Sequence, residues 1–239
     1  MRNEGGDMES LRRTARIAGV LYLVTCIPAP FSLLYVPNAL IVRGNAAETA
    51  SRILASQWML LAGMAGELIN SIAFLFATLA LYRLLQGVNK PLASLMVTLF
   101  AISIPISCLN VLNDIAALIL VRGADFLSVF TKPQRDALAM LFLRLHGSGV
   151  LVAQIFWGLW LFPFGMLVYR SGFIPRILGV LLIVNGLAYP IQSFTGLLLP
   201  RYHGVISRVT FPLLFGEAAI ILWLLIRGVR DRPLVEAAA

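Results

Sequence analysis

Two glutamates interrupt apolar stretches that are long enough to cross a membrane. Glu67 and Glu217 each follow a glycine within such a stretch. A carboxylate in the hydrocarbon region of a bilayer costs at least about 2.5 kcal/mol on insertion scales, so each needs a partner, a proton or a bound ligand. Ionisable residues inside membrane spans mark ion pathways, proton relays and ligand sites. We therefore take both glutamates as candidate ligand or proton sites.

Other polar residues fall within the same apolar stretches, and their depth follows from a rise of 1.5 Å per helical residue. Counting from the basic residue at the inner end of each stretch gives three layers, at about 36, 24 and 14 Å. The outermost layer is a rim of Asp114 and His146, the middle layer holds Glu67, Gln154 and Gln192, and the innermost holds Glu217 and Asn185. The layers predict an outward-facing polar cavity that binds or transports a small polar or cationic ligand, or protons.

A second interpretation stays open for the same residues. Buried amides and carboxyls hydrogen-bond neighbouring membrane helices for about 0.6 kcal/mol each, so they can serve helix packing alone. The protein would then be structural or regulatory, with its buried polar residues only holding the helices together.

An intramembrane enzyme is the least favoured class. The chain has no His-Glu-x-x-His or Gly-x-Ser-x-Gly motif. Its two histidines, His146 and His203, lie at the ends of different apolar stretches, and Cys26 and Cys108 each lie singly within one. The sequence therefore predicts no catalytic residue, no metal site and no cofactor.

Membrane-spanning helices are the elements that must position these residues. The composition is 59% hydrophobic and 13% charged, against about 25% charged residues in an ordinary soluble domain. Six apolar segments reach the roughly 20 residues that a helical span requires. The six segments are Ile17–Tyr35, Leu60–Tyr82, Pro91–Leu120, Gly147–Tyr169, Ile174–Leu199 and Val209–Ile226. We predict an all-α polytopic membrane helix bundle with six transmembrane helices.

Basic residues predict the orientation of this bundle. The connections 84–90 and 170–173 are very short and flanked by positive charge, which places them in the cytoplasm. The chain then divides into a cytoplasmic segment 1–15, a transmembrane domain 16–228 and a cytoplasmic tail 229–239. The net charge of +8 fits this topology and contact with anionic lipids. The bilayer is the expected partner, a homo-oligomer is compatible with the sequence, and no nucleic-acid binding is predicted.

The longer outer connections predict two short interfacial helices. Asn45-Ala-Ala-Glu48 resembles a capping box that opens a helix to about Gln57. Thr131-Lys-Pro-Gln134 opens a second helix with an apolar face, which we expect to lie on the outer membrane surface before the fourth span.

The chain also repeats itself. The segment Arg16–Val24 reappears as Arg176–Val184 with six of nine positions identical. The pair Gly66-Glu67 in the second span matches Gly216-Glu217 in the sixth. A helical hairpin repeated three times is one interpretation, since such repeats occur in transporters. Chance similarity between apolar segments is the other.

Segments spread over nearly the whole chain carry a family resemblance. They include Thr14–Leu23, Ala46–Ala50, Val88–Ala93, Gly123–Phe126 and Tyr169–Leu181. Together they resemble the bacterial multi-pass membrane family of uncharacterised function known as domain of unknown function 4386. The resemblance implies an inner (plasma) membrane protein with an acid at Glu67, a histidine at His146 and the Gly-Glu pair at 216–217. The chain departs from the family at Gln192 and Ala101, where an aspartate and an arginine are common, and the resemblance implies no activity.

Overall fold

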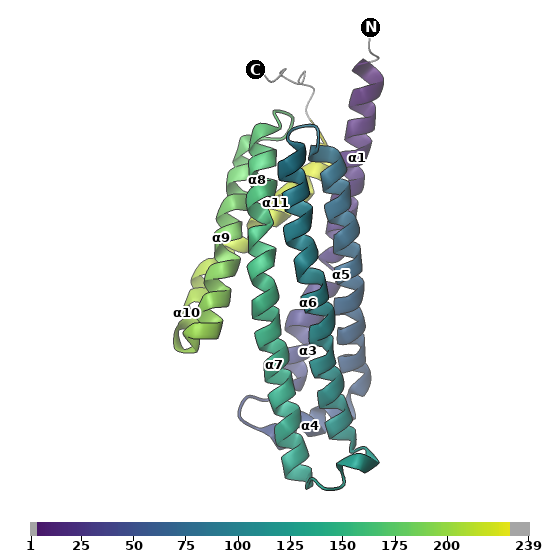
Figure 1. Ribbon diagram of the computed structural model, residues 1–239, viewed down its shortest axis with the longest axis vertical. Helices are drawn as coiled ribbons and strands as arrows, with labels where there is room; N and C mark the ends of the chain where they lie inside the picture. The colour runs from purple at the N-terminus through teal and green to yellow at the C-terminus, as the bar shows by residue number, and fades with distance from the viewer. Residues whose placement is uncertain (1–3, 230–239) are drawn as a thin grey trace. The chain divides into compact units, whose positions relative to one another are not determined.

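Helices form all the regular structure of residues 4–229, the part of the chain that the computed structural model describes (Figure 1). In chain order they are α1 (Glu4–Thr25), α2 (Pro28–Pro30), η1 (Phe31–Tyr35), α3 (Val36–Leu40), α4 (Ala46–Ala55), α5 (Gln57–Leu85), α6 (Lys90–Arg122), η2 (Asp125–Leu127), α7 (Lys132–Leu159), α8 (Leu161–Arg170), α9 (Arg176–Leu198), α10 (Pro200–Thr210), η3 (Phe211–Phe215) and α11 (Gly216–Ile226).

Six helical stretches are long and apolar enough to cross a membrane. They are Glu9–Leu40, Gln57–Leu85, Lys90–Arg122, Lys132–Arg170, Arg176–Leu198 and Pro200–Ile226. Each one contains or overlaps a span predicted from the sequence. The prediction of an all-α bundle with six transmembrane helices is therefore confirmed.

The first stretch is not one continuous α-helix. Helix α1 ends at Thr25, and the π-helical turn η1 lies between the short helices α2 and α3. Three prolines, Pro28, Pro30 and Pro37, lie in this region. Proline has no backbone N–H and crowds the preceding turn, so it interrupts the regular i→i−4 hydrogen bonds. The break in the first span thus follows from its prolines.

Contacts between residues divide the chain into two compact units. Unit 1 comprises Met1–Val24, Ala73–Ser103 and Gln154–Ala239, and unit 2 comprises Thr25–Ile72 and Ile104–Ala153. The predicted transmembrane domain, residues 16–228, includes parts of both. The predicted tail 229–239 lies outside the described residues except for Val229.

In unit 2, apolar side chains of α3, α4, α5, α6 and α7 form one buried cluster. Helix α4 joins this cluster through Ala50 and Ile53, whereas Leu54 is 40% exposed. The side chain of Asn45 accepts a hydrogen bond from the Glu48 backbone N–H at 2.9 Å. An oxygen acceptor at this position satisfies one of the free N–H groups of a helix start. The predicted start of this helix is confirmed.

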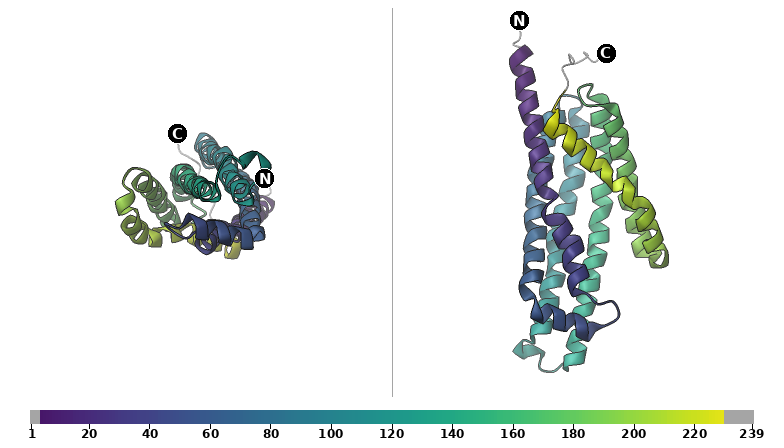
Figure 2. Two further views of the ribbon diagram at one scale, coloured as in Figure 1. Left: turned by 90° about the horizontal axis from the view of Figure 1, so that it is seen from below. Right: turned by 180° about the vertical axis from the view of Figure 1, so that it is seen from behind.

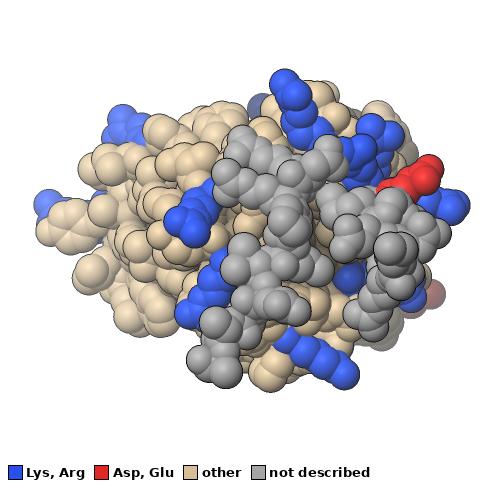
Figure 3. All heavy atoms as spheres, turned by 90° about the horizontal axis from the view of Figure 1, so that it is seen from above, with Lys and Arg blue, Asp and Glu red and all other residues tan. Residues whose placement is uncertain are grey.

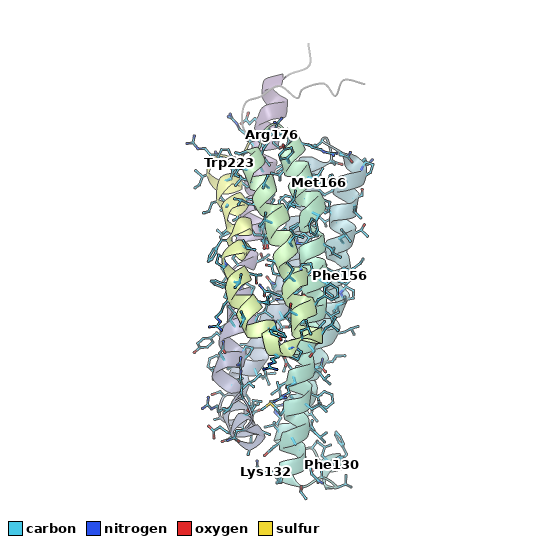
Figure 4. The ribbon with its side chains drawn as sticks, turned by 90° about the vertical axis from the view of Figure 1, so that its left-hand side faces the viewer. Phe130, Lys132, Phe156, Met166, Arg176 and Trp223 are labelled. Atoms are coloured by element: carbon cyan, nitrogen blue, oxygen red, sulfur yellow. The ribbon has the colours of Figure 1, made fainter. Side chains whose placement is uncertain are left out.

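The second outer helix differs from the prediction of a separate surface helix. Residues 132–145 form the first half of α7, which continues without a break into the fourth span. The helix begins where the sequence indicated, since Gln134 Oε1 accepts a hydrogen bond from the Thr131 N–H at 2.8 Å. Lys132, labelled in Figure 4, lies in its first turn. Ala139 and Leu143 of this segment are buried in the core of unit 2, and Leu138 and Phe142 pack against it. Leu141 and Leu145 are 50% and 46% exposed.

Aromatic side chains form a cluster in the core of unit 1. The ring of Trp160 lies with its centroid 6.0 Å from that of Tyr22, 5.6 Å from Phe74, 5.4 Å from Phe100 and 5.2 Å from Phe164. Trp160 itself is 1% exposed. Aromatic pairs at such distances contribute about 0.5–1.5 kcal/mol each beyond the area they bury. The cluster thus holds α1, α5, α6 and α8 together.

Glycines allow close helix contacts in unit 1. A Cβ atom on Gly165 of α8 or on Gly179 of α9 would come within 2.6 Å of the other glycine's carbonyl oxygen. Gly19 occupies the position of Gly179 in the nine-residue repeat, and a Cβ there would meet Leu224 of α11 at 3.1 Å. Both repeat segments therefore place a glycine against another span. This equivalence supports the repeat, which stays a prediction.

Basic residues bound the helices at one end of unit 1. Arg83 lies in the last turn of α5, Lys90 begins α6, Arg170 ends α8 and Arg176 begins α9. Seen from above, this end carries several lysine and arginine side chains and few acidic ones (Figure 3). The cytoplasmic placement of this end and of both termini stays a prediction.

Candidate functional site

Three of the predicted polar residues meet in unit 2. The imidazole of His146 in α7 lies between the carboxylates of Glu67 in α5 and Asp114 in α6. Its Nε2 is 3.2 Å from Glu67 Oε1, and its Nδ1 is 3.1 Å from Asp114 Oδ2. The side chains of Glu67 and His146 are 10% exposed and that of Asp114 is 9% exposed. We call these three residues the triad.

The ends of α5 and α6 set the register of the triad. Gln57, the first residue of α5, accepts a hydrogen bond from Nε of Arg122, the last residue of α6, at 2.7 Å. The two helices therefore run antiparallel in unit 2. Glu67 lies ten residues from Gln57, and Asp114 lies eight residues from Arg122. The distances of the two acids from this shared end of the helices therefore differ by about 3 Å. Side chains tilt toward the N-terminus of their own helix, so these two carboxylates lean toward each other.

The depth of Glu67 thus differs from the prediction. Counting from the basic residues at the opposite ends of the helices placed Glu67 about 12 Å deeper than Asp114 and His146. The structure instead places Glu67 in contact with His146. The count treated all spans as straight and level, and it neglected the direction in which side chains lean.

The residue pattern of α6 explains which side chains face the triad. Asn110 and Asp114 are four residues apart, lie on one face and are buried. Leu109 and Leu112 are 66% and 56% exposed. Helix α6 therefore turns its polar residues inward and its apolar residues toward the surface that lipid would cover, as expected of polar groups in membrane helices.

A second layer of residues holds α7 beside the triad. The Asn110 Nδ2 group donates a hydrogen bond to the backbone carbonyl of His146 at 2.9 Å. Gly149, one turn along α7, leaves room for this carboxamide, because a Cβ at position 149 would overlap the Asn110 side chain. Asn113 Nδ2 donates in turn to Asn110 Oδ1 at 3.0 Å. These contacts fix the position of the His146 backbone.

The charge of the triad is not balanced by a basic side chain. An ionised carboxylate only accepts hydrogen bonds, and a neutral imidazole has one N–H to donate. With both carboxylates ionised and His146 neutral, the triad carries two negative charges. Among the described side chains, the ion pairs of Lys or Arg in unit 2 join Arg52 to Glu48 and Lys132 to Asp136, and none involves the triad. A bound cation or protons must supply the missing positive charge.

Glu217 lies in unit 1 and has a different environment. After α9, helix α10 turns back beside it (Figure 2), and η3 leads into α11, whose first turn carries Glu217. The Glu217 carboxylate accepts hydrogen bonds from the Tyr22 hydroxyl, from Asn185 Nδ2 at 3.0 Å and from the Tyr189 hydroxyl at 3.0 Å. These three donors satisfy acceptor positions of the Glu217 carboxyl group.

The two predicted glutamines also lie in unit 1. Gln192 Nε2 donates a hydrogen bond to Thr210 Oγ1 at 2.6 Å. Gln154 Oε1 is buried, and no hydrogen-bond partner for it occurs among the described residues. Neither glutamine forms part of the triad.

The structure therefore gathers the predicted residues into two groups. Glu67 joins the rim residues Asp114 and His146 in unit 2, and Asn185 joins Glu217 in unit 1. A single funnel through all of them stays a prediction. Tyr22 and Tyr189 were not among the predicted site residues. Their one sequence signal is a tyrosine inside an apolar span, away from the membrane interfaces where tyrosine is usual.

Neither the family nor the relative that matches the chain is described with an activity. The profile of the family described as "Domain of unknown function (DUF4386)" matches residues 17–228, which include the triad and Glu217. An "Uncharacterized protein" of Archaeoglobus fulgidus is 35% identical over 77 residues, which are 32% of this chain and 44% of the relative. The chain thus matches less than half of that relative's length. No solved structure matches the chain.

Proposed function

The chain belongs to the DUF4386 family, and we propose that it is a multi-pass membrane protein that binds a small cation at the triad of Glu67, Asp114 and His146. One observation carries the proposal: a single imidazole lies between two carboxylates, and no lysine or arginine among the described side chains pairs with either carboxylate. A cation carrier is the class of protein that this site suits best.

Burial makes the negative charge of the triad expensive. The side chains are about nine-tenths buried within helices that are long and apolar enough to span a membrane. Charge in such surroundings is retained when an opposite charge and hydrogen bonds compensate its lost hydration. Intramembrane acids of this kind mark ion and substrate pathways. A bound cation compensates both carboxylates at once.

The contacts of Glu217 support the second interpretation, in which buried polar residues serve helix packing alone. Its three donors come from α1 and α9 and meet a carboxylate of α11. The group therefore links three helices and needs no cation. We assign Glu217 to helix packing and the triad to ligand binding.

Cation binding and entry test the proposal directly. The full chain is placed in lipid nanodiscs for calorimetric titration with Na⁺, K⁺, Mg²⁺ and Mn²⁺, and in vesicles with trapped indicators for entry of the same ions and of H⁺. Glu67→Gln is compared with Glu48→Gln, since Glu48 is 47% exposed and pairs with Arg52 of its own helix α4. At least one cation should bind or enter through the unmodified chain and through Glu48→Gln, with at least a tenfold loss in Glu67→Gln. The proposal fails if no cation distinguishes the two variants.

A further inference from the structure

We propose that the cation bound by the triad is a divalent transition-metal ion, with Glu67, Asp114 and one ring nitrogen of His146 as its ligands. This inference rests on the proposed cation binding and names the class of cation. The candidate ligand atoms of the three residues all lie within 4.8 Å of one another. The three residues belong to the helices α5, α6 and α7, and their side chains meet in unit 2.

Charge favours a divalent ion over a monovalent one. With both carboxylates ionised and the imidazole neutral, the three side chains carry two negative charges. A divalent ion alone makes the site neutral, whereas a monovalent ion leaves one negative charge in a span until a proton also binds. Uncompensated charge is strongly disfavoured in such surroundings, so the neutral complex is the stable one.

The donor atoms favour a transition metal over Mg²⁺ or Ca²⁺. Those two ions bind oxygen ligands, and Mg²⁺ retains several waters. Imidazole suits Zn²⁺, Fe²⁺, Ni²⁺ and Cu²⁺, and carboxylates suit Mn²⁺. One nitrogen and two carboxylates therefore select the group of ions that accept both donors, from Mn²⁺ and Fe²⁺ to Zn²⁺.

The spacing of the donors fits coordination to one ion. Metal–ligand bonds to nitrogen and oxygen are about 2.0–2.2 Å, which separates neighbouring donors on one ion by roughly 3.0–3.4 Å. His146 Nε2 and Glu67 Oε1 are 3.2 Å apart. Asp114 Oδ2 lies 3.1 Å from the other ring nitrogen, so it joins the same ion after a side-chain rotation, which the 4.8 Å limit on the three donor atoms allows.

Residues that contact the triad fix the position of His146 before an ion binds. Asn110 binds the backbone of His146, and Gly149 makes room for Asn110. Loss of such outer-layer contacts costs about 10–100-fold in metal affinity at known sites. Asn110 is therefore a positioning residue for the proposed site.

Electron paramagnetic resonance of Mn²⁺ on the full chain in nanodiscs tests the inference. Mn²⁺ is chosen because it prefers carboxylate oxygens to thiolates, so Cys26 and Cys108 compete poorly for it. One Mn²⁺ per chain should bind, and the bound ion should show coupling to a nitrogen nucleus. This spectrum is recorded on the unmodified chain, so it does not depend on whether a variant folds. Saturating binding without nitrogen coupling, or no saturable binding, overturns the inference.

Variants then assign the ligands. Glu67→Gln and Asp114→Asn should each weaken Mn²⁺ binding by more than the roughly 100-fold upper limit for outer-layer residues. Asn110→Ala should weaken it about 10–100-fold and keep the nitrogen coupling. Glu48→Gln and His203→Gln should bind as the unmodified chain does. Equal binding in Glu67→Gln and Glu48→Gln contradicts the assignment.

The identity of the cations that bind distinguishes a failure of the transition-metal inference from a failure of the proposed cation binding. If only H⁺ or a monovalent ion binds in a Glu67-dependent manner, the metal is excluded and the cation site stands. If no cation depends on Glu67, both are excluded.

Discussion

Two glycines of the same helix provide a paired test of the packing behind the triad. Gly147 and Gly149 both lie in α7. A Cβ at Gly147 meets nothing within 4 Å, whereas one at Gly149 overlaps the Asn110 carboxamide. Alanine is better than glycine in a helix by roughly 1 kcal/mol. Gly147→Ala should therefore stabilise the protein by up to about 1 kcal/mol.

The same substitution at Gly149 should have the opposite sign. Forcing a methyl group into a filled site costs about 1–3 kcal/mol. Displacing Asn110 also removes its hydrogen bond to the His146 carbonyl, about 0.5–1.5 kcal/mol. After the gain in helix propensity, Gly149→Ala should destabilise by about 0.5–3.5 kcal/mol.

Thermal unfolding in detergent measures the difference between the two variants. A change of 1 kcal/mol shifts the Tm of a chain of this size by about 2–4 °C. A gap of about 1.5–4.5 kcal/mol between the variants then corresponds to roughly 3–18 °C, with Gly149→Ala lower. Equal Tm values for Gly147→Ala and Gly149→Ala would refute the packing of Asn110 against α7.

Four further measurements address other parts of the structure. Tyr22→Phe removes one donor from the Glu217 carboxylate and should destabilise by about 1.5–3 kcal/mol in chemical unfolding; an unchanged free energy of unfolding would contradict that contact. Asn45→Ala removes the cap of α4 and should cost about 0.5–2 kcal/mol in the same assay, whereas a neutral result would exclude the cap. Gly179→Ala should lower the Tm, because its Cβ would meet backbone atoms of α8, and a raised Tm would contradict this contact. Mn²⁺ at 100 times its Kd should stabilise the unmodified chain by about 2.7 kcal/mol and a chelator should reverse this, with no such effect in Glu67→Gln.

The spans could be predicted from the sequence because length and hydropathy determine them. A run of roughly 20 apolar residues has few alternatives to a membrane helix, and each predicted span lies within or overlaps one of the six long apolar helical stretches of the described residues. The start of α4 could also be predicted, since the Asn45 side chain accepts a hydrogen bond from a backbone N–H only three residues away. The junction before the fourth span could not be predicted, because helix α7 continues through a segment of which Ala139 and Leu143 pack in the core of unit 2.

The triad could be predicted only in part from the sequence. Its three residue types were visible as costly polar groups in apolar spans, but their mutual contacts depend on helix register and rotation. The contact between Gln57 and Arg122 reveals that register, and no local pattern predicts it. The donors to Glu217 were hidden for a similar reason, because Tyr22 is separated from it by 195 residues of chain.

The most direct test of the cation site is calorimetric titration of the chain and of the double variant Glu67→Gln/Asp114→Asn with each cation in turn. Both substitutions preserve side-chain size and remove the two negative charges of the triad. We predict that the unmodified chain binds one cation per chain and that the double variant does not bind it. Indistinguishable binding of every cation by the two proteins would contradict the account.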